Sequence, residues 1–83
     1  MKYKYSKTVR DKIEFTLIKP CCEVDGSDLM TLINRHGPNL SNVIIIEPDK
    51  NNLFKFKGID HDKFLYFSSN ENFDDLIWVN ATL

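Results

Sequence analysis

Hydrophobic and polar residues alternate near the amino terminus with the period of two that a half-buried strand requires. Within residues 12–19, Ile13, Phe15 and Leu17 fall on one face, and Glu14 and Thr16 fall on the other. Residues 2–6 alternate in the same way, as Lys-Tyr-Lys-Tyr-Ser. Pro20 lacks the N–H group that a sheet needs, so we expect the strand over residues 12–19 to end there.

A period close to 3.6 residues follows between residues 28 and 36 and predicts one helix. The apolar stripe of this segment consists of Leu29, Leu32, Ile33 and His36. Ser27 is a favourable N-cap for such a helix. At the other end we expect Gly37 to take a left-handed conformation, and Pro38 prevents the helix from continuing.

Three further apolar segments predict three strands joined by short turns. Residues 43–46 are a continuous β-branched run, which is typical of a central strand buried on both faces. Residues 53–57 alternate and residues 64–67 are apolar again. Turn-forming residues at 48–52 and 60–63 separate these segments, and this favours an antiparallel meander.

The end of the chain fits two patterns. One is a helix capped by Asn72, with its stripe at Phe73, Leu76, Ile77 and Asn80. The other is a strand, because residues 76–79 have β-branched and aromatic content. We expect a short helical turn that leads into a strand. The predicted fold is α+β: a small antiparallel sheet of four to five strands packed against one main α-helix. The predicted order is β-α-β-β-β, and the sequence does not decide whether the last element is a helix or a strand.

Length and composition limit this fold to one domain. A chain of 83 residues is too short to support two cores, so residues 1–83 should form a single unit. The apolar fraction of 42% and the charged fraction of 28% are typical of globular proteins. The ~20 consecutive apolar residues of a membrane helix are missing, and so is the apolar stretch of a secretory signal. We therefore expect a cytoplasmic protein with no membrane partner.

Residues with metal-binding or catalytic chemistry are scattered along the chain, at Cys21, Cys22, His36, Asp60, His61 and Asp62. Zinc sites use spaced pairs of ligands, whereas two adjacent cysteines point apart and cannot staple the fold. His36 is better placed to meet the last carbonyls of the helix. The Asp-His-Asp segment has ordinary turn composition. We predict no metal, no cofactor and no enzymatic activity, with both thiols reduced.

A nucleic-acid surface is the alternative function. Residues 1–12 contain five cations and one anion, although the whole chain has a net charge of −1. Lysines also interleave with aromatic residues over residues 53–57, where they could contact phosphates and stacked bases. The residues of this alternative single-stranded RNA-binding surface are Lys2, Lys4, Arg10, Lys55 and Lys57. The same phenylalanines can instead form the core, and the RNP1 signature is absent, so we expect a protein partner before a nucleic acid.

Protein binding is the function that the remaining features favour. A sheet covered by one helix leaves a second face and an edge, and an edge can pair with a partner strand or with a second copy of the chain. The expected contact residues are Tyr66, Asp74, Asp75 and Trp78. Nine Lys, eight Asn and eight Ile indicate A/T-rich coding, which suggests a phage or a mobile element. We therefore expect a small inhibitor or modulator of a host or competitor protein, acting in the host cytoplasm by steric occupation of a partner surface.

Overall fold

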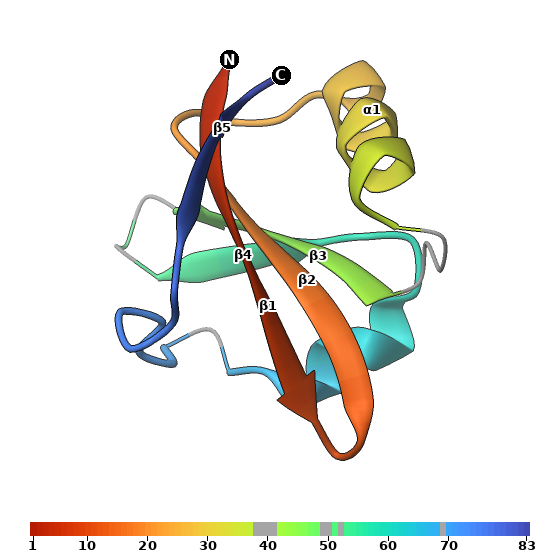
Figure 1. Cartoon of the computed structure of the whole chain (residues 1–83), viewed down its shortest axis with the longest axis vertical. Coiled ribbons are helices and arrows are strands. Elements are labelled where there is room, and N and C mark those ends of the chain that lie inside the picture. The colour runs from red at the N-terminus through yellow and green to blue at the C-terminus, as the bar shows by residue number, and fades with distance from the viewer. Residues whose placement is uncertain (38–41, 49–50, 52, 69) are drawn as a thin grey trace.

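The computed structural model describes residues 1–37, 42–48, 51, 53–68 and 70–83, and the predicted turn at 48–52 lies partly outside them. The elements in chain order are β1 (Lys2–Arg10), β2 (Ile13–Pro20), α1 (Gly26–His36), β3 (Val43–Pro48), β4 (Phe54–Lys57), the 3₁₀ helix η2 (His61–Tyr66) and β5 (Val79–Thr82) (Figure 1). This order differs from the predicted β-α-β-β-β, because β1 is a long strand of its own and residues 64–67 do not form one.

The five strands form one sheet in the order β4-β3-β2-β1-β5. Neighbouring strands are antiparallel except β2 and β3, which run parallel. The sheet is therefore mixed, and the predicted antiparallel arrangement is wrong at this pair. The reason is that α1 follows β2 and carries the chain back along the sheet, so that β3 starts from the same end as β2.

A two-residue turn sets the register between β1 and β2. Asp11 and Lys12 have φ angles of 53° and 65°, and positive values at both positions are the mark of a type I′ turn. Turns of this type match the twist of the two strands that they join. The resulting register places Lys4 directly opposite Lys19.

Helix α1 confirms the predicted helix and ends at His36 as expected, but it differs at its start and in the conformation of Gly37. It begins earlier than expected, because Asp25 rather than Ser27 caps it by accepting a hydrogen bond of 2.8 Å from the N–H of Asp28. Gly37 donates its N–H to a carbonyl of the last turn. Its φ of −142° is extended, so the predicted left-handed conformation is wrong. The predicted stop at Pro38 lies outside the described residues.

Residues 64–67, predicted as a strand, belong mostly to η2. Asp60 caps η2 by accepting a hydrogen bond of 3.1 Å from a backbone N–H of the first turn. The chain approaches the sheet closely just before this point, since a Cβ on Gly58 would lie 2.9 Å from the carbonyl oxygen of Val43 and 3.2 Å from the ring of Phe64. The aromatic side chains of this segment pack against one face of the sheet, and its backbone does not add a further strand.

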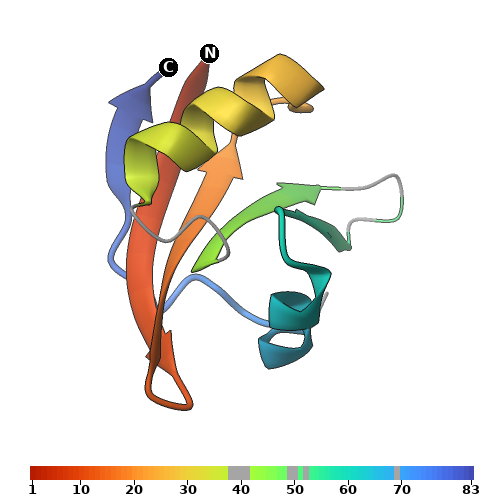
Figure 2. The ribbon, with the colours of Figure 1, turned by 90° about the vertical axis from the view of Figure 1, so that its right-hand side faces the viewer.

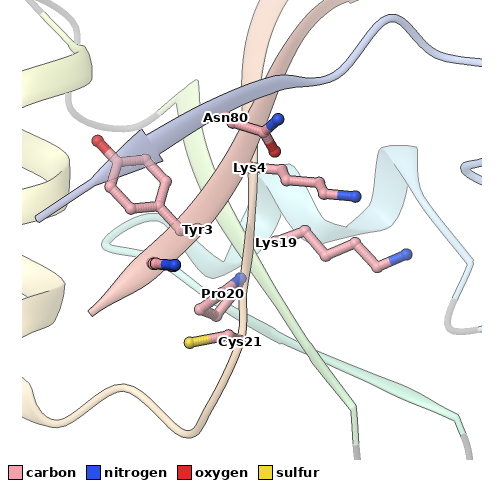
Figure 3. A pocket seen from close by; sticks show the side chains of 7 residues that line it. Tyr3, Lys4, Lys19, Pro20, Cys21 and Asn80 are labelled. Atoms are coloured by element: carbon pink, nitrogen blue, oxygen red, sulfur yellow. The ribbon is translucent and has the colours of Figure 1, made fainter.

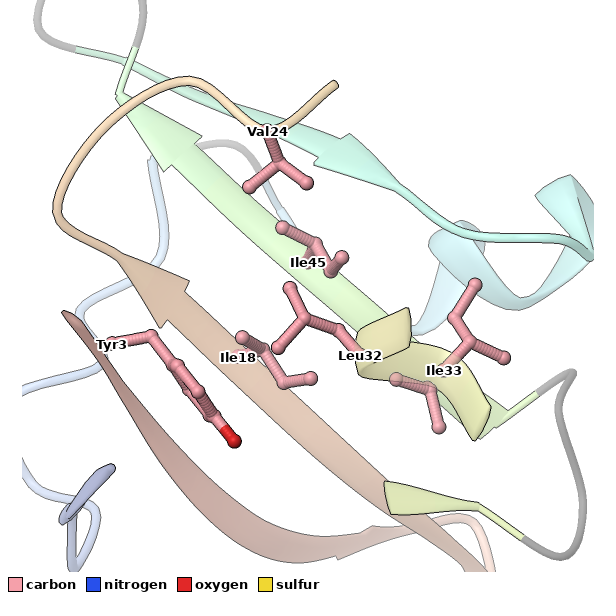
Figure 4. Packing of buried hydrophobic residues seen from close by; sticks show 7 residues of the cluster. Tyr3, Ile18, Val24, Leu32, Ile33 and Ile45 are labelled. Atoms are coloured by element: carbon pink, nitrogen blue, oxygen red, sulfur yellow. The ribbon is translucent and has the colours of Figure 1, made fainter. Parts of the chain in front are cut away.

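Both faces of the sheet carry a hydrophobic cluster. Below α1 the buried residues are Tyr3, Ile18, Val24, Leu32, Ile33, Val43 and Ile45 (Figure 4). On the other face, where η2 and the following segment pack, they are Phe15, Leu17, Ile44, Ile46, Phe67 and Phe73 (Figure 2). Residues 43–46 are at most 1% exposed, which confirms the prediction of a strand buried on both faces. The second face is therefore covered over β2 and β3, and it is open near the start of β1.

The carboxy-terminal segment forms a turn followed by a strand, as predicted, but the strand lies at Val79–Thr82 and not over residues 76–79. Residues 74–75 form a turn, and β5 follows it. β5 pairs antiparallel with the first part of β1, and the N–H of Leu83 donates to the carbonyl of Met1 at 2.8 Å. The two ends of the chain therefore lie side by side (Figure 1).

Candidate functional site

A hollow of about 300 Å³ lies on the open part of the sheet, where β1, β2 and β5 meet (Figure 3). Its lining residues are Lys2, Tyr3, Lys4, Lys19, Pro20, Cys21 and Asn80. The side chains of Lys4 and Lys19 extend side by side in one direction from neighbouring strands, and Asn80 lies next to Lys4. The aromatic ring of Tyr3 points to the opposite face and packs below α1. The charged and amide residues that line the hollow are therefore three lysines and one asparagine.

The register of the sheet forces these lysines together. Lys4 is the cross-strand partner of Lys19 on one side and of Asn80 on the other, while Lys2 shares the same face of β1. Like charges at direct cross-strand positions repel each other. Among the described residues, no carboxylate lines the hollow and none forms an ion pair with these three lysines. The positive charge here is uncompensated and attracts anions.

Two aromatic rings adjoin the hollow through Lys19. The ammonium nitrogen of this lysine lies 5.5 Å from the ring centre of Phe54 and 5.9 Å from that of Trp78, both within the range of cation–π contacts. The indole N–H of Trp78 donates a hydrogen bond of 2.9 Å to the carbonyl of Phe73, which orients the ring. The half-buried rings of Phe54 and Trp78 therefore lie next to the positive charge of Lys19.

The other basic residues proposed for nucleic-acid contact lie elsewhere. Arg10, at the far end of β1, forms an ion pair with Glu71 and donates to the carbonyl of Tyr66 at 3.4 Å. Lys55 and Lys57 lie on β4 with their side chains on the α1 face of the sheet, opposite to the hollow. The structure brings only the two lysines of β1 from that set into the hollow.

Lys57 has a structural role in a buried network. The carboxylate of Glu47 is 3% exposed, and its Oε1 accepts a hydrogen bond of 2.6 Å from the N–H of Val24. Its Oε2 lies 3.4 Å from the Nζ of Lys57, which also donates to the carbonyl of Val24 at 2.8 Å. Buried carboxylates need such partners. The network ties the segment before α1 to β3 and β4.

The four residues proposed for protein contact lie between η2 and the start of β5. Asp74 and Asp75 are exposed in the turn that precedes β5. Trp78 follows them on the same short segment, whereas Tyr66 belongs to η2 and packs 5.4 Å from the ring of Phe15. Tyr66 and Trp78 are half-buried against the second cluster, so each has a packing role in addition to its exposed surface.

The outer edge of β1 is free beyond the end of β5. β5 pairs with β1 only up to Tyr5, whereas β1 continues to Arg10. Since the carbonyl of Lys2 accepts from β2, the alternation of an antiparallel pair directs the backbone groups of odd-numbered β1 residues outward. Lys7 and Val9 thus present N–H and C=O groups to an edge beside which the described chain places no strand.

The free edge is flanked by exposed apolar side chains. Val9, on β1 itself, is 62% exposed, and Ile77, just before β5, is 86% exposed. Both belong to residue types that normally bury their side chains. Sequence analysis identified an available edge but not these two residues.

His36 lies in a hydrogen-bonded cluster that joins α1 to the sheet. The hydroxyl of Tyr3 and the Nε2 of His36 share a hydrogen bond of 2.7 Å. Arg35 donates to the same hydroxyl at 3.3 Å and to the carbonyl of Thr82 at 2.8 Å. Burial lowers the pKa of His36, and the charges of Arg35 and Lys7 act in the same direction. The neutral imidazole is therefore favoured, and its hydrogen-bond partner is Tyr3. The predicted contact of His36 with the last helix carbonyls is not found among the described residues.

The cysteines form an exposed pair of free thiols with their Sγ atoms 3.9 Å apart. The hydrogen bond shared with Cys21 raises the pKa of the Cys22 thiol, which disfavours the thiolate needed for nucleophilic chemistry. The described residues include no group of three or more His, Cys, Asp or Glu side chains arranged to hold a metal ion. A helix with the length and apolarity to cross a membrane is likewise missing from the described part of the chain.

Lys19 and Asn80 are the residues of the hollow that sequence analysis did not identify. The position of Lys19 opposite Lys4 depends on the turn at residues 11–12, whose Asp-Lys sequence lacks the glycine typical of this turn. Asn80 reaches the hollow only because β5 pairs with the opposite end of the chain. No local sequence pattern predicts this pairing of β5 with β1.

Comparisons with protein-family models, with curated proteins and with solved structures found no match to this chain. The lysine-lined hollow and the free edge of β1 are the two surface features that bear on function.

Proposed function

We propose that this protein is a small protein-binding module that inhibits or modulates its partner by occupying the partner's surface. The observation that carries the proposal is the free outer edge of β1 at Lys7 and Val9. Unpaired N–H and C=O groups in a row are a template for an added strand, which is a common mode of peptide recognition.

Side chains around the edge supply the contacts that a short edge lacks. Two residues with outward N–H and C=O groups offer few backbone hydrogen bonds, so affinity must come largely from apolar contact. Val9, Ile77 and Val79 are exposed apolar residues on or next to the two strands that border the edge. The exposed carboxylates of Asp74 and Asp75 precede Ile77 and favour an extended segment with basic residues.

Steric inhibition fits the size and composition of the chain. It needs a surface but no cofactor, and the A/T-rich coding inferred from the Lys, Asn and Ile content supports a phage or mobile-element gene. Such a product acts in the cytoplasm of its host. Single-stranded nucleic acid, the alternative ligand, would use a different face of the molecule.

The test compares two substitutions at Val9 in a pull-down of tagged protein from host lysate, treated with nuclease and washed at moderate salt. Val9→Pro removes an outward N–H and leaves the bonds to β2 in place, so the fold should survive, as circular dichroism can verify. Val9→Thr keeps the N–H group. We expect a stoichiometric partner that the Thr variant retains and the Pro variant loses. Equal capture by both variants, or no nuclease-resistant partner, would contradict strand addition.

Two further measurements define the surface. Combined alanine substitution of Tyr66, Asp74, Asp75 and Trp78 should weaken capture while the fold is kept; full capture would remove these four residues from the interface. The same edge can pair with a second copy of the chain, and light scattering after size exclusion distinguishes this arrangement, since Val9→Pro would convert such a dimer to a monomer.

A further inference from the structure

We infer that the lysine-lined hollow binds the phosphate of a nucleotide, either free or within a single-stranded nucleic acid. The hollow lies on the face of the sheet away from α1 and near the start of β1, whereas the proposed protein interface lies along the edge at the end of that strand. The inference therefore concerns a second ligand, and Trp78 is the residue that it shares with the first proposal.

The arrangement of charge is the first argument. Lys4 and Lys19 are direct cross-strand partners, and Lys2 adds a third ammonium group on the same face. This arrangement is unfavourable on its own, because like charges in this position repel. An anion near the ammonium groups would reduce the repulsion, so the hollow is suited to an anionic ligand.

The number of donors is the second argument. A phosphate has several acceptor oxygens and more than one negative charge in its monoester form, and ammonium groups are strong donors to it. Three lysines with the amide of Asn80 can satisfy several oxygens at once. A single carboxylate has fewer acceptor sites and would leave part of the positive charge uncompensated.

The neighbouring rings favour a nucleotide over other phosphates. Trp78 and Phe54 lie within 5.9 Å and 5.5 Å of the Lys19 ammonium group. Bases stack on exposed aromatic rings whatever their sequence, and lysines beside such rings hold the backbone. The volume of about 300 Å³ also matches the small end of ligand sites.

The experiment measures the anisotropy of a labelled single-stranded oligothymidylate of about twelve nucleotides, titrated with the full chain. The variants are Lys4→Gln combined with Lys19→Gln, and Lys55→Gln as a control on the opposite face. We expect the double variant to weaken binding about tenfold or more, because two phosphate contacts are lost, and to reduce the slope of log K against log salt by about 1.4. The control should change affinity less than about twofold.

A second arm uses ATP alone, measured by calorimetry with the same proteins. Binding of ATP that the double variant loses would identify a free nucleotide, whereas binding of the oligonucleotide without ATP would identify a nucleic-acid strand. The inference is overturned if neither probe binds at low salt, or if Lys55→Gln weakens binding as much as the double variant. Equally effective displacement of the oligonucleotide by polyglutamate would also overturn it.

Thermal unfolding gives a readout that does not depend on the labelled probe. Inorganic phosphate should raise the melting temperature of the wild type, since a ligand of the folded state stabilises it. The double variant should lack this rise and should be the more stable protein at low salt without phosphate, because its cross-strand repulsion is gone. An equal rise in both proteins would exclude Lys4 and Lys19 as the site.

Discussion

Replacing Lys57 with methionine tests the buried network that holds the segment before α1. Methionine keeps most of the aliphatic stem, so the substitution removes charge with little change in packing. It deletes the ammonium group 3.4 Å from Glu47 Oε2 and the hydrogen bond of 2.8 Å to the carbonyl of Val24. The carboxylate stays buried and keeps only its bond from the N–H of Val24.

The expected cost follows from the geometry. At 3.4 Å and an effective dielectric constant of about 20, the gross attraction between the two charges is about 5 kcal/mol. Desolvation of the pair already offsets much of this attraction. The Lys57 side chain is 35% exposed, so water can replace part of what the carboxylate loses. We expect the free energy of unfolding to fall by about 2–3 kcal/mol, close to the cost of leaving a charged hydrogen-bonding group unpaired.

Urea denaturation followed by circular dichroism measures this change, and Lys55→Met is the matched control. Lys55 lies on the same strand and face but is exposed and outside the network, so its replacement should change stability by less than about 0.5 kcal/mol. Adding Glu47→Gln to Lys57→Met removes the buried charge, and the combined cost should be at least about 1 kcal/mol smaller than the sum of the two. Equal stability of the two lysine variants would refute the reasoning.

Two other predictions concern stability. Because burial and nearby cations lower the pKa of His36 below 6.5, folding favours its neutral form, and the corresponding stability is present above about pH 6.5 and lost as the pH falls towards the folded-state pKa. When the pH is lowered from about 7.5 to about 5.5, the free energy of unfolding measured in urea should therefore fall more for the wild type than for His36→Gln. An equal fall in both proteins would contradict this. Lys12→Gly should raise the free energy of unfolding by about 0.5–1 kcal/mol, because the φ of 65° at this position is unfavourable for a side chain. Lys12→Ala, which keeps a Cβ, should show no such gain in thermal unfolding, and a similar gain in both variants would exclude the backbone explanation.

Local periodicity was sufficient for the elements that bury one clear stripe or a continuous run. Leu32 and Ile33 mark the buried side of α1, and residues 43–46 are buried on both faces as their β-branched composition predicts. Periodicity carries no information on strand direction. The parallel pairing of β2 and β3 follows from the path of α1 over the sheet, and this is a property of the whole fold.

Residues 64–67 show how packing overrides a local pattern. The apolar run Phe-Leu-Tyr-Phe has the composition of a strand, yet extending the sheet beyond β4 would leave the face over β2 and β3 uncovered. As η2, the segment places Phe67 against Phe15 with ring centres 5.1 Å apart, while Leu65 remains 87% exposed. Burial of the aromatic side chains thus determines the local backbone conformation.

The distribution of basic residues was visible in the sequence, but their partners were not. Arg10 and Lys57 are used within the fold, by Glu71 and Glu47 respectively, and neither acid is near its partner in the sequence. Lys4 and Lys19 remain unpaired with any described carboxylate because both project from the open part of one face. The number of lysines in the sequence therefore indicated positive charge. The register of the strands was needed to show which of these lysines lie together.

The length of β5 relates the two candidate surfaces to each other. Where β5 pairs with β1, it completes the hollow by placing Asn80 beside Lys4. Where β5 has not yet begun, the outward backbone groups of Lys7 and Val9 have no neighbouring strand in the described chain. A longer β5 would cover the edge, and a shorter one would leave the hollow without its amide. One strand, β1, thus carries a charged surface on its paired half and a strand-binding edge on its unpaired half, and Trp78 is the residue that the two proposed surfaces share.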